Sequence, residues 1–317
     1  MITSSPLESA EPTVDLDGKV AIVTGAGRGL GRAEAIELAA RGAAVVVNDY
    51  GVALDGVVPT GSPAQEVAQE IRAAGGRAVA HLGDVADWDA AQGLVKTAVA
   101  EFGKLDILVN NAGILRDRMI FSMSEDEFDS VVRVHLKGHF AMLRHGTAYW
   151  RDASKAAGGP VYARVVNTSS EAGLLGSPGQ PNYGAAKNGI IALTLATAAG
   201  GAKYGVRANA IAPRARTRMT SDVFDAPEGE VDPLAPEHVA PLVAFLSSPL
   251  AERISGQVFV AYGAFVGLVA APEYAARFTT DAAGWTTDEL AVRLHEHFEH
   301  HDPRSTFAAT GLLKTEA

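Results

Sequence analysis

Seven short runs of apolar residues recur along the chain, separated by stretches with helical periodicity. They cover residues 19–24, 44–48, 77–81, 106–110, 164–168, 207–211 and 257–261. Runs that are apolar on both faces and alternate with helices are typical of parallel strands covered on both sides. Right-handed crossovers arrange such strands as a doubly wound sheet. The pattern therefore predicts a single α/β domain over residues 18–270, with a seven-stranded parallel sheet.

Four segments depart from this alternation. They are a polar, aperiodic leader (1–17), an insertion after the second strand (51–63), a surface turn before the fifth strand (151–161) and a C-terminal helical extension (271–317). The leader is predicted to be flexible. In the extension, Thr287 opens a helix with an N-cap and an acidic first turn, and Leu290, Leu294 and Phe298 share one face. We expect that face to pack on its own subunit or on a neighbour.

Composition narrows the classes of partner. The net charge of −10 argues against nucleic acid or an anionic membrane as the main partner. The absence of cysteine excludes disulfides, a thiolate nucleophile and a cysteine-based metal site. No signal peptide and no apolar run of membrane-spanning length is recognisable, so a cytoplasmic location is predicted. Four histidines in the tail are interpreted as a solvated helix face rather than a metal site: His295, His297, His300 and His301.

A glycine-rich turn follows the first apolar run and leads into a helical pattern. Gly25, Gly29 and Gly31 have the spacing G-x-x-x-G-x-G, with Leu30 where the commoner G-x-G-x-x-G pattern has its third glycine. Glycines permit a tight turn and close backbone approach, and the N-terminus of the helix then faces an anion. The turn therefore predicts a site for the pyrophosphate of a dinucleotide on a Rossmann-type sheet.

An acidic residue at the end of the second strand predicts which dinucleotide binds. Asp49 lies about twenty residues beyond the turn, where a carboxylate binds the ribose hydroxyls. A 2′-phosphate about 4 Å away would be repelled by roughly 4 kcal/mol at an effective dielectric of about 20. Arg28 is the opposing signal, because an arginine in the loop can pair with such a phosphate. The balance favours NAD over NADP.

A candidate catalytic set follows the fifth strand. Tyr183 and Lys187 lie four residues apart on a predicted helix and project from one face. A cation beside a tyrosine favours the phenolate and so lowers a pKa that starts near 10. Ser170 closes the preceding strand and can donate to a substrate oxygen. Together the three predict a general acid/base, a group that tunes its pKa, and a carbonyl polariser.

These motifs, in this order, resemble those of the short-chain dehydrogenase/reductase family over residues 18 to about 265. The matching stretches are Thr24-Gly-x-x-x-Gly-x-Gly31, Asp84-Val85, Asn110-Asn-Ala-Gly113, Ser170 and Tyr183-x-x-x-Lys187. A closer resemblance is to the (3R)-hydroxyacyl-CoA dehydrogenase part of peroxisomal multifunctional enzyme type 2, also called 17β-hydroxysteroid dehydrogenase type 4. That resemblance rests mainly on Val47-Asn-Asp49, Asn110–Arg118 and Val134–Gly138.

The resemblance implies a role for each matching residue. Gly25, Arg28, Gly29, Leu30 and Gly31 would line the pyrophosphate turn, Asp49 would hold the adenosine ribose, and Asp84 and Val85 the adenine. Asn111, Ala112 and Gly113 would lie at the nicotinamide ribose. Tyr183 would be the acid/base and Ser170 the partner of the carbonyl. Lys187 would tune Tyr183 and bind the nicotinamide ribose.

Three features depart from the family pattern. His135 stands where the family usually has an asparagine that assists a water relay, and a histidine can still donate and accept there. Arg214 replaces a glycine, and Ala261-Tyr-Gly263 replaces Asp-Gly-Gly. The last two put the substrate loop and the subunit contacts in doubt, but not the chemistry.

Residues 214–236 are predicted to form a substrate lid after the sixth strand. Met219, Val223 and Phe224 are placed to cover an apolar substrate. Two interpretations of its basic run stay open. Arg214, Arg216 and Arg218 either meet the phosphates of coenzyme A or balance Asp222 and Asp225 in a solvated turn.

The leading hypothesis is an NAD-dependent dehydrogenase of secondary alcohols, with 3-hydroxyacyl-CoA thioesters as substrates and 17β-hydroxysteroids as a second class. One alternative is an NADPH-dependent 3-oxoacyl thioester reductase acting on acyl-carrier protein. Another is a non-catalytic nucleotide-binding scaffold on the same fold. The family resemblance implies a homodimer or homotetramer, paired through the helices that follow the fourth and fifth strands.

Overall fold

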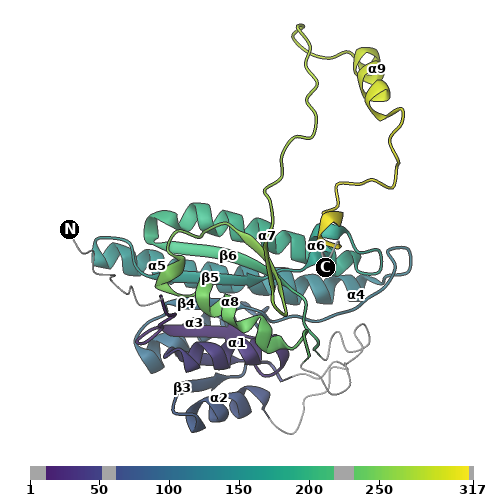
Figure 1. Ribbon diagram of the computed structural model, residues 1–317. Helices are drawn as coiled ribbons and strands as arrows, with labels where there is room; N and C mark the ends of the chain where they lie inside the picture. The colour runs from purple at the N-terminus through teal and green to yellow at the C-terminus, as the bar shows by residue number, and fades with distance from the viewer. Residues whose placement is uncertain (1–11, 52–61, 218–231, 314–317) are drawn as a thin grey trace, which may run out of the picture. The chain divides into compact units, whose positions relative to one another are not determined.

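The computed structural model describes residues 12–51, 62–217 and 232–313 (Figure 1). The chain divides into two units, residues 1–268 and 269–317. Several predictions fall outside the described residues. They are residues 1–11 of the leader, residues 52–61 of the insertion, and Arg218, Met219, Asp222, Val223, Phe224 and Asp225 of the proposed lid.

The first unit is built on one sheet with strand order β3-β2-β1-β4-β5-β6-β7-β8. The strands are β1 (Val20–Thr24), β2 (Ala44–Asn48), β3 (Arg77–His81), β4 (Ile107–Asn110), β5 (Ala163–Thr168), β6 (Val206–Pro213), β7 (Val258–Tyr262) and β8 (Phe265–Leu268). The seven predicted strands are confirmed, and all seven pair in parallel. The strand order reverses between β1 and β4, where doubly wound sheets leave a crevice beyond the carboxyl ends of their strands.

The prediction of seven strands was one short, and the sheet is not wholly parallel. β8 pairs antiparallel with β7 through a two-residue turn, so that Tyr262 lies opposite Phe265. Gly263 has φ +49°, a left-handed conformation that glycine adopts without strain. The rings of Tyr262 and Phe265 stack with centroids 5.0 Å apart. The sequence signal for β8 was the turn at Gly263 followed directly by a second apolar run, which the sequence analysis overlooked.

Helices cover both faces of the sheet (Figure 1). One face carries α1 (Gly29–Ala40), α2 (Pro63–Ala73) and α8 (Ala240–Leu246), and the other carries α3 (Trp88–Phe102), α5 (Gly138–Ala157) and α7 (Pro181–Gly201). Successive strand residues point to opposite faces of the sheet. Val23 of β1 packs in the cluster with α1, whereas Ile22 packs with α3 and α5. This alternation explains why the strands are apolar throughout. None of the described helices is long and apolar enough to cross a membrane.

Shorter helical segments connect these elements. They are α4 (Glu125–Val132), the π-helical segment η1 (Arg133–Lys137), α6 (Glu171–Leu175) and the single turns η2 (Ala202–Tyr204), η3 (Pro236–His238) and η4 (Pro249–Ala251). η1 continues directly from α4 into α5. π-Helical turns inside longer helices are often found at functional sites.

The prediction of a surface turn over residues 151–161 was partly wrong, because α5 extends to Ala157. Trp150 and Ser154 are buried on its inner side, and the Trp150 indole donates to the Leu105 carbonyl over 2.7 Å. These contacts hold the helix against the sheet for two further turns. It ends at Gly158, whose φ of +69° suits a C-terminal glycine.

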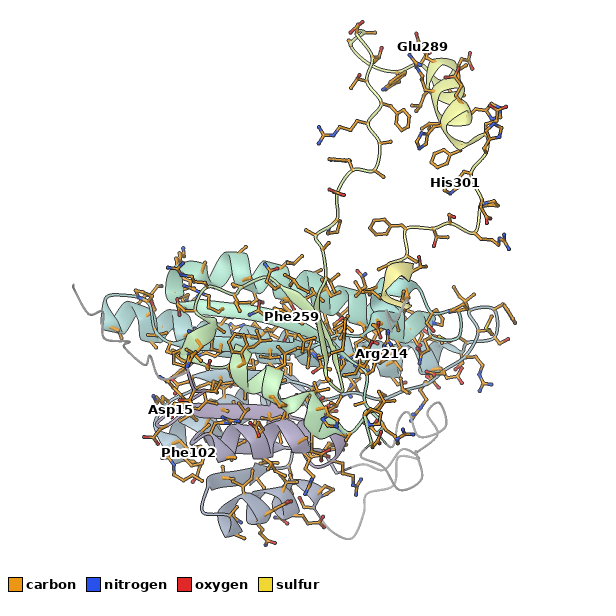
Figure 2. The ribbon with its side chains drawn as sticks, viewed as in Figure 1. Asp15, Phe102, Arg214, Phe259, Glu289 and His301 are labelled. Atoms are coloured by element: carbon orange, nitrogen blue, oxygen red, sulfur yellow. The ribbon has the colours of Figure 1, made fainter. Side chains whose placement is uncertain are left out.

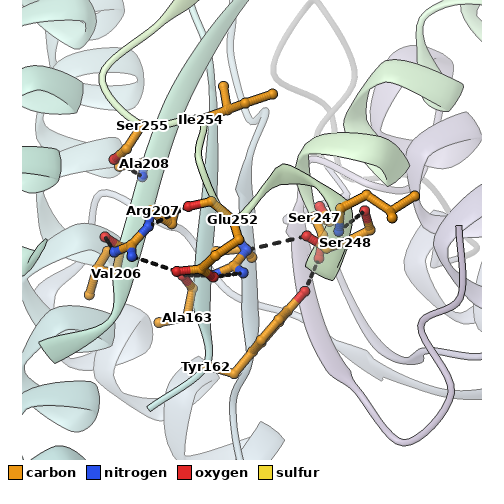
Figure 3. A network of polar contacts seen from close by, with 12 residues as sticks. Tyr162, Ala163, Val206, Arg207, Ala208, Ser247, Ser248, Glu252, Ile254 and Ser255 are labelled. Atoms are coloured by element: carbon orange, nitrogen blue, oxygen red, sulfur yellow. Dashed lines mark hydrogen bonds and ion pairs between the residues drawn. The ribbon is translucent and has the colours of Figure 1, made fainter. Parts of the chain in front are cut away.

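A polar network joins β5, β6 and the segment after α8 near the amino ends of the strands (Figure 3). Arg164 is 1% exposed and donates to the Glu252 carboxylate over 2.6 Å. Arg207 donates to the other oxygen of that carboxylate over 2.5 Å, and the Tyr162 hydroxyl donates to the Ser247 carbonyl over 2.6 Å. Glu252 therefore neutralises a buried guanidinium and ties two strands together.

The second unit contains α9 (Thr287–Phe298) and a final turn, η5 (Thr310–Leu313). The predicted helix is confirmed, but its N-cap is Thr286 rather than Thr287. Thr286 and Glu289 form a capping box, with each side chain bonded to the backbone N–H of the other residue. No residue of α9 is fully buried, and the packing partner expected for its apolar face stays a prediction.

Candidate active site

The glycine turn lies between β1 and the end of β4. The Thr24 hydroxyl accepts the backbone N–H groups of Asn111 (3.0 Å) and Ala112 (3.2 Å). The Asn111 side-chain amide donates to the carbonyls of Thr24 (3.2 Å) and Gly25 (3.3 Å). Asn111 thus locks the turn to β4, a structural contact in addition to the cofactor role that the sequence predicts for it.

Two glycines of the turn have no room for a side chain. Gly25 has φ +63°, and a Cβ there would lie 2.7 Å from the Ala112 Cα. At Gly31 a Cβ would lie 2.5 Å from the Asn111 amide nitrogen and would also meet the Gly25 carbonyl. Helix α1 then begins at Gly29 without a side-chain cap from Arg28, which is exposed. Its first N–H groups therefore suit an anionic ligand such as a pyrophosphate.

Asp49 is fixed against this turn. One carboxylate oxygen accepts the Gly27 N–H over 2.9 Å, and the other accepts the Gly51 N–H over 2.7 Å. These bonds hold a negative charge beside the loop at the end of β2. Because each carboxylate oxygen can accept more than one hydrogen bond, the ribose hydroxyls of a dinucleotide can still bind.

The predicted adenine residues follow β3. The Asp84 carboxylate accepts from the Ala86 N–H over 2.8 Å and from Arg133 over 2.5 Å. Val85 is 7% exposed, and a Cβ at Gly138 would lie 2.9 Å from it. The ion pair with Arg133 connects this segment to η1, a link that the sequence analysis did not find.

Ser170, Tyr183 and Lys187 converge at the end of β5. Ser170 is the N-cap of α6, and its hydroxyl accepts the Ala172 N–H over 3.2 Å. Tyr183 stands in the first turn of α7 and Lys187 one turn later. The Lys187 ammonium lies 5.3 Å from the Tyr183 ring centroid and donates to the Thr168 carbonyl over 2.6 Å. The arrangement places a proton donor/acceptor, a hydroxyl and a cation together.

Asn182, directly before the tyrosine, was missed by the sequence analysis. It is fully buried, and its side-chain amide donates to the carbonyls of Arg116 and Glu127, both over 2.9 Å. Its side-chain oxygen accepts the Tyr183 N–H over 2.8 Å. Asn182 therefore fixes the start of α7. An asparagine at a helix start is a recognisable signal, although its partners are distant in the sequence.

His135 on η1 packs beneath the same site. Its Nε2 lies 3.0 Å from the Ile114 nitrogen and 2.7 Å from the Ile114 oxygen, and its ring meets that of Tyr183 edge-on with centroids 5.1 Å apart. A Cβ at Gly113 would collide with the imidazole. Burial holds the pKa of His135 well below its usual value, so the ring is neutral. His135 therefore braces the chain after β4 from the position where the family usually has asparagine.

The pKa of the Tyr183 hydroxyl is shifted in the opposite direction to the prediction. Burial of its hydroxyl raises the pKa of Tyr183 to about 12, and the hydrogen bond with Ser170 only partly opposes the rise. Burial also lowers the pKa of Lys187 to about 7, opposed by the charge of Glu34. Desolvation, and not attraction to the neighbouring cation, therefore dominates the pKa of Tyr183. Glu34 was not among the predicted residues.

The two arginines described in the substrate segment are paired. Arg214, labelled in Figure 2, binds both carboxylate oxygens of Glu171 and lies over the Tyr262 ring, 4.5 Å from its centroid. Arg216 donates to Asp232 over 2.7 Å. The departures from the family pattern at Arg214 and Tyr262 therefore contact each other. The guanidinium charges are balanced within the protein, which weakens the idea that they meet coenzyme A phosphates.

The residues around the glycine turn suit a dinucleotide. Backbone closes tightly around the glycine turn, a helix N-terminus opens from it, and Asp49 stands beside it. Among residues 12–51, 62–217 and 232–313, no group of three or more His, Asp or Glu side chains is arranged to hold a metal.

Comparison with known proteins identifies the family. The family model for short chain dehydrogenases matches residues 19–228. The chain belongs to this family. It is therefore an oxidoreductase that acts on CH–OH groups with a nicotinamide dinucleotide, NAD or NADP. The dinucleotide site inferred from the glycine turn agrees with this assignment.

Two curated relatives in this short-chain dehydrogenase family are close in sequence. Hydroxyacyl-CoA dehydrogenase ChsB1 of Mycobacterium tuberculosis is 52% identical over 311 residues, which cover 95% of each chain. Peroxisomal multifunctional enzyme type 2 of Mus musculus is 45% identical over 247 residues, which cover 78% of this chain and 32% of that enzyme. The crystal structure of a short chain dehydrogenase from Mycobacterium avium superposes with a TM-score of 0.79 at 51% identity, covering 91% of this chain and 97% of that one.

Proposed function

We propose that this short-chain dehydrogenase uses NAD to oxidise the secondary alcohol of 3-hydroxyacyl-CoA thioesters. The observation that carries the proposal is the convergence of Ser170, Tyr183 and Lys187 at the end of β5. The substrate class is supported by the relative from M. tuberculosis, which is named as a hydroxyacyl-CoA dehydrogenase and matches almost the whole chain.

The chain's own residues divide the work of the reaction. The bound nicotinamide would supply the acceptor for a hydride from the carbinol carbon. Ser170 holds the substrate oxygen, and Tyr183 takes the proton of its hydroxyl, so that alcohol becomes ketone as the C–H and O–H bonds break. The Lys187 ammonium favours the phenolate of Tyr183 against the cost of burial. His135 and Asn182 keep the surrounding backbone in position.

Replacement of Tyr183 tests the chemistry. In Tyr183→Phe we expect kcat to fall about a hundredfold or more, the usual contribution of a general base, with NADH binding preserved. Tyr149→Phe, on α5, is the matched control and should keep normal turnover. Near-normal turnover by Tyr183→Phe would refute the mechanism. Bound dinucleotide without turnover of any alcohol by the natural enzyme would favour the non-catalytic scaffold.

The choice of NAD rests on the fixed carboxylate of Asp49. We expect NADH to bind more tightly than NADPH, and Asp49→Asn to narrow that difference by reducing repulsion of a 2′-phosphate. Dissociation constants from fluorescence titration measure both. Tighter NADPH binding by the natural enzyme would overturn this part of the proposal.

A sequence relative supports the alternative function, reduction of 3-oxoacyl thioesters of acyl-carrier protein. A 3-oxoacyl-[acyl-carrier-protein] reductase of Synechocystis is 38% identical over 257 residues. A turnover panel with 3-hydroxyacyl-CoA, the acyl-carrier-protein thioester and a 17β-hydroxysteroid separates the candidates. We expect the CoA thioester to have the highest kcat/KM. Preference for acyl-carrier protein together with NADPH would establish the alternative.

We also propose that subunits pair through α5 and α7. A groove of about 450 Å³ runs along these two helices, lined by Phe140, Leu143, Leu193 and other side chains. Phe140 is 46% exposed, and Leu195 is 48% exposed on α7. Apolar side chains that are exposed on two neighbouring helices are typical of an interface.

The division into residues 1–17, 18–270 and 271–317, and a cytoplasmic location, likewise stay proposals from the sequence.

A further inference from the structure

Arg214 and Tyr262 both depart from the family pattern, and the reaction as proposed uses neither side chain. Arg214 directly follows β6, and its backbone N–H continues the ladder to β7 by donating to the Ala261 carbonyl over 3.0 Å. Tyr262 is the last residue of β7. The carbon of the Arg214 guanidinium lies 4.5 Å from the Tyr262 ring centroid. Two adjacent strands therefore end in a cation and an aromatic ring that contact each other.

The carboxylate that pairs with Arg214 belongs to the residue directly after Ser170. Glu171 is the first residue of α6, and Ser170 is the N-cap of that helix. The guanidinium donates through Nε and Nη2 to the two carboxylate oxygens of Glu171, the Nη2 bond measuring 2.7 Å. Only 21% of the Arg214 side chain and 12% of the Glu171 side chain are exposed. A two-point pair fixes direction as well as distance, because the planar guanidinium matches the plane of the carboxylate.

Helix α6 depends on its neighbours for its position. It has five residues, Glu171–Leu175, and so short a helix has little stability of its own. It packs closely on α7: a Cβ at Gly173 would lie 2.7 Å from the Asn188 backbone nitrogen, and the Asn188 side-chain amide donates to the Gly173 carbonyl over 2.7 Å. The contacts with α7 and with Arg214 therefore hold α6, and Ser170 at its start, in place.

The Tyr262 ring restricts the guanidinium of Arg214. The face of an aromatic ring is electron-rich and attracts a cation placed over it. The Tyr262 ring is itself stacked on Phe265 of β8, with centroids 5.0 Å apart. A free arginine side chain samples many rotamers, and ordering it costs conformational entropy. The hairpin of β7 and β8 thus supplies a surface on which the arginine is already ordered before it meets Glu171.

We propose that Glu171 and Arg214, with the Tyr262 ring behind the guanidinium, are positioning residues for the reaction: they hold α6 so that the Ser170 hydroxyl meets the substrate oxygen. The effect on turnover rests on the proposed function, because it passes through Ser170. The anchoring of α6 does not depend on which alcohol is oxidised. The two departures from the family pattern thereby share one role.

The anchoring of α6 can be measured without substrate. Hydrogen–deuterium exchange over residues 170–176, read by mass spectrometry, reports how readily the amides of α6 open to solvent. In Arg214→Gln, which leaves the sequence of this peptide intact, we expect exchange about tenfold faster, the effect of losing a charge-assisted hydrogen bond. Glu70→Gln is the matched control, because Glu70 also binds Arg32 through both carboxylate oxygens. It should leave exchange in α6 unchanged. Unchanged exchange in Arg214→Gln overturns the proposal.

Kinetics test whether the pair acts as one unit. We expect kcat to fall about tenfold in Glu171→Gln, in Arg214→Gln and in the double variant alike, because an interaction is lost only once. NADH affinity should not change. Tyr262→Leu should also lower kcat, and Tyr262→Phe, which keeps the ring face, should restore most of it. If Arg214→Gln does not fold, Arg214→Lys replaces it, since lysine keeps the charge but cannot bind both oxygens.

A Ser170→Ala background tests whether the pair acts through Ser170. There Glu171→Gln should cause no further loss of kcat, whereas a general structural fault would lower kcat again. A further loss in that background, or losses that multiply in the double variant of Glu171 and Arg214, overturns the positioning role. So does normal kcat in Glu171→Gln. If the natural enzyme oxidises another alcohol and not 3-hydroxyacyl-CoA, only the proposed function is contradicted, and the same variants are compared on that alcohol.

Discussion

The buried carboxyl group of Glu34 predicts how folding stability depends on pH, because burial shifts its pKa in a known direction and by a known amount. The pKa of this carboxyl is raised from 4.5 to about 8 in the folded protein. The unfolded chain therefore releases a proton above pH 4.5 that the folded protein keeps until about pH 8. Folding stability must fall as pH rises through this window and level off above it. Glu34→Gln removes the titrating group and with it this loss.

The size follows from the same shift. One pKa unit corresponds to about 1.4 kcal/mol at 25 °C, so the two pH units between pH 5 and pH 7 correspond to about 3 kcal/mol. Lys187 titrates at about pH 7 and contributes little slope below it. The difference in free energy of unfolding between Glu34→Gln and the natural protein should therefore shift by about 3 kcal/mol in favour of the variant from pH 5 to pH 7. A constant cost for burying an amide does not alter that difference.

Urea unfolding followed by circular dichroism measures the effect. The natural protein, Glu34→Gln and the control Glu37→Gln are compared at pH 5, 6 and 7 and at one protein concentration. Groups common to all three cancel in the differences. The control should track the natural protein, because Glu37 forms only an exposed pair with Arg41. If the advantage of Glu34→Gln were the same at every pH, Glu34 would not titrate as a buried carboxyl.

Three further predictions concern the turn, the polar network and the subunit contact. Gly31→Ala should weaken NADH binding at least about tenfold by fluorescence titration, since its Cβ has no room, whereas Gly93→Ala on α3 should not. Glu252→Gln should cost about 2 kcal/mol in urea unfolding because Arg164 stays buried and charged; a loss near zero would contradict the network's role. Phe140→Glu should shift the protein to smaller species in size-exclusion chromatography with light scattering, and an unchanged mass would place the contact elsewhere.

Much of the site was predictable because its signals are local in the sequence. The glycine turn requires residues that tolerate close backbone approach, and the structure shows no room for a side chain at Gly25 or Gly31. The Tyr183 and Lys187 spacing follows from the pitch of one helix. Asp49 ends the second predicted strand and faces the turn. In each case a few neighbouring residues carry the whole geometric requirement.

Other features depend on contacts between distant parts of the chain. The pairing of Arg214 with Glu171 and Tyr262 joins three separate elements, and Asn182 reaches carbonyls more than fifty residues away. The edge strand β8 was overlooked because a four-residue apolar run carries little periodicity on its own. Spacing along the sequence does not predict contacts between residues that are far apart in the chain.

The sequence by itself determined the α/β alternation and the glycine turn, and it predicted the candidate catalytic trio, because each depends on local spacing and residue type. The tertiary structure alone decided how those groups are charged. Burial raises the pKa values of Tyr183 and Glu34 and lowers that of Lys187. Desolvation depends on everything packed around a group, and no local pattern encodes it.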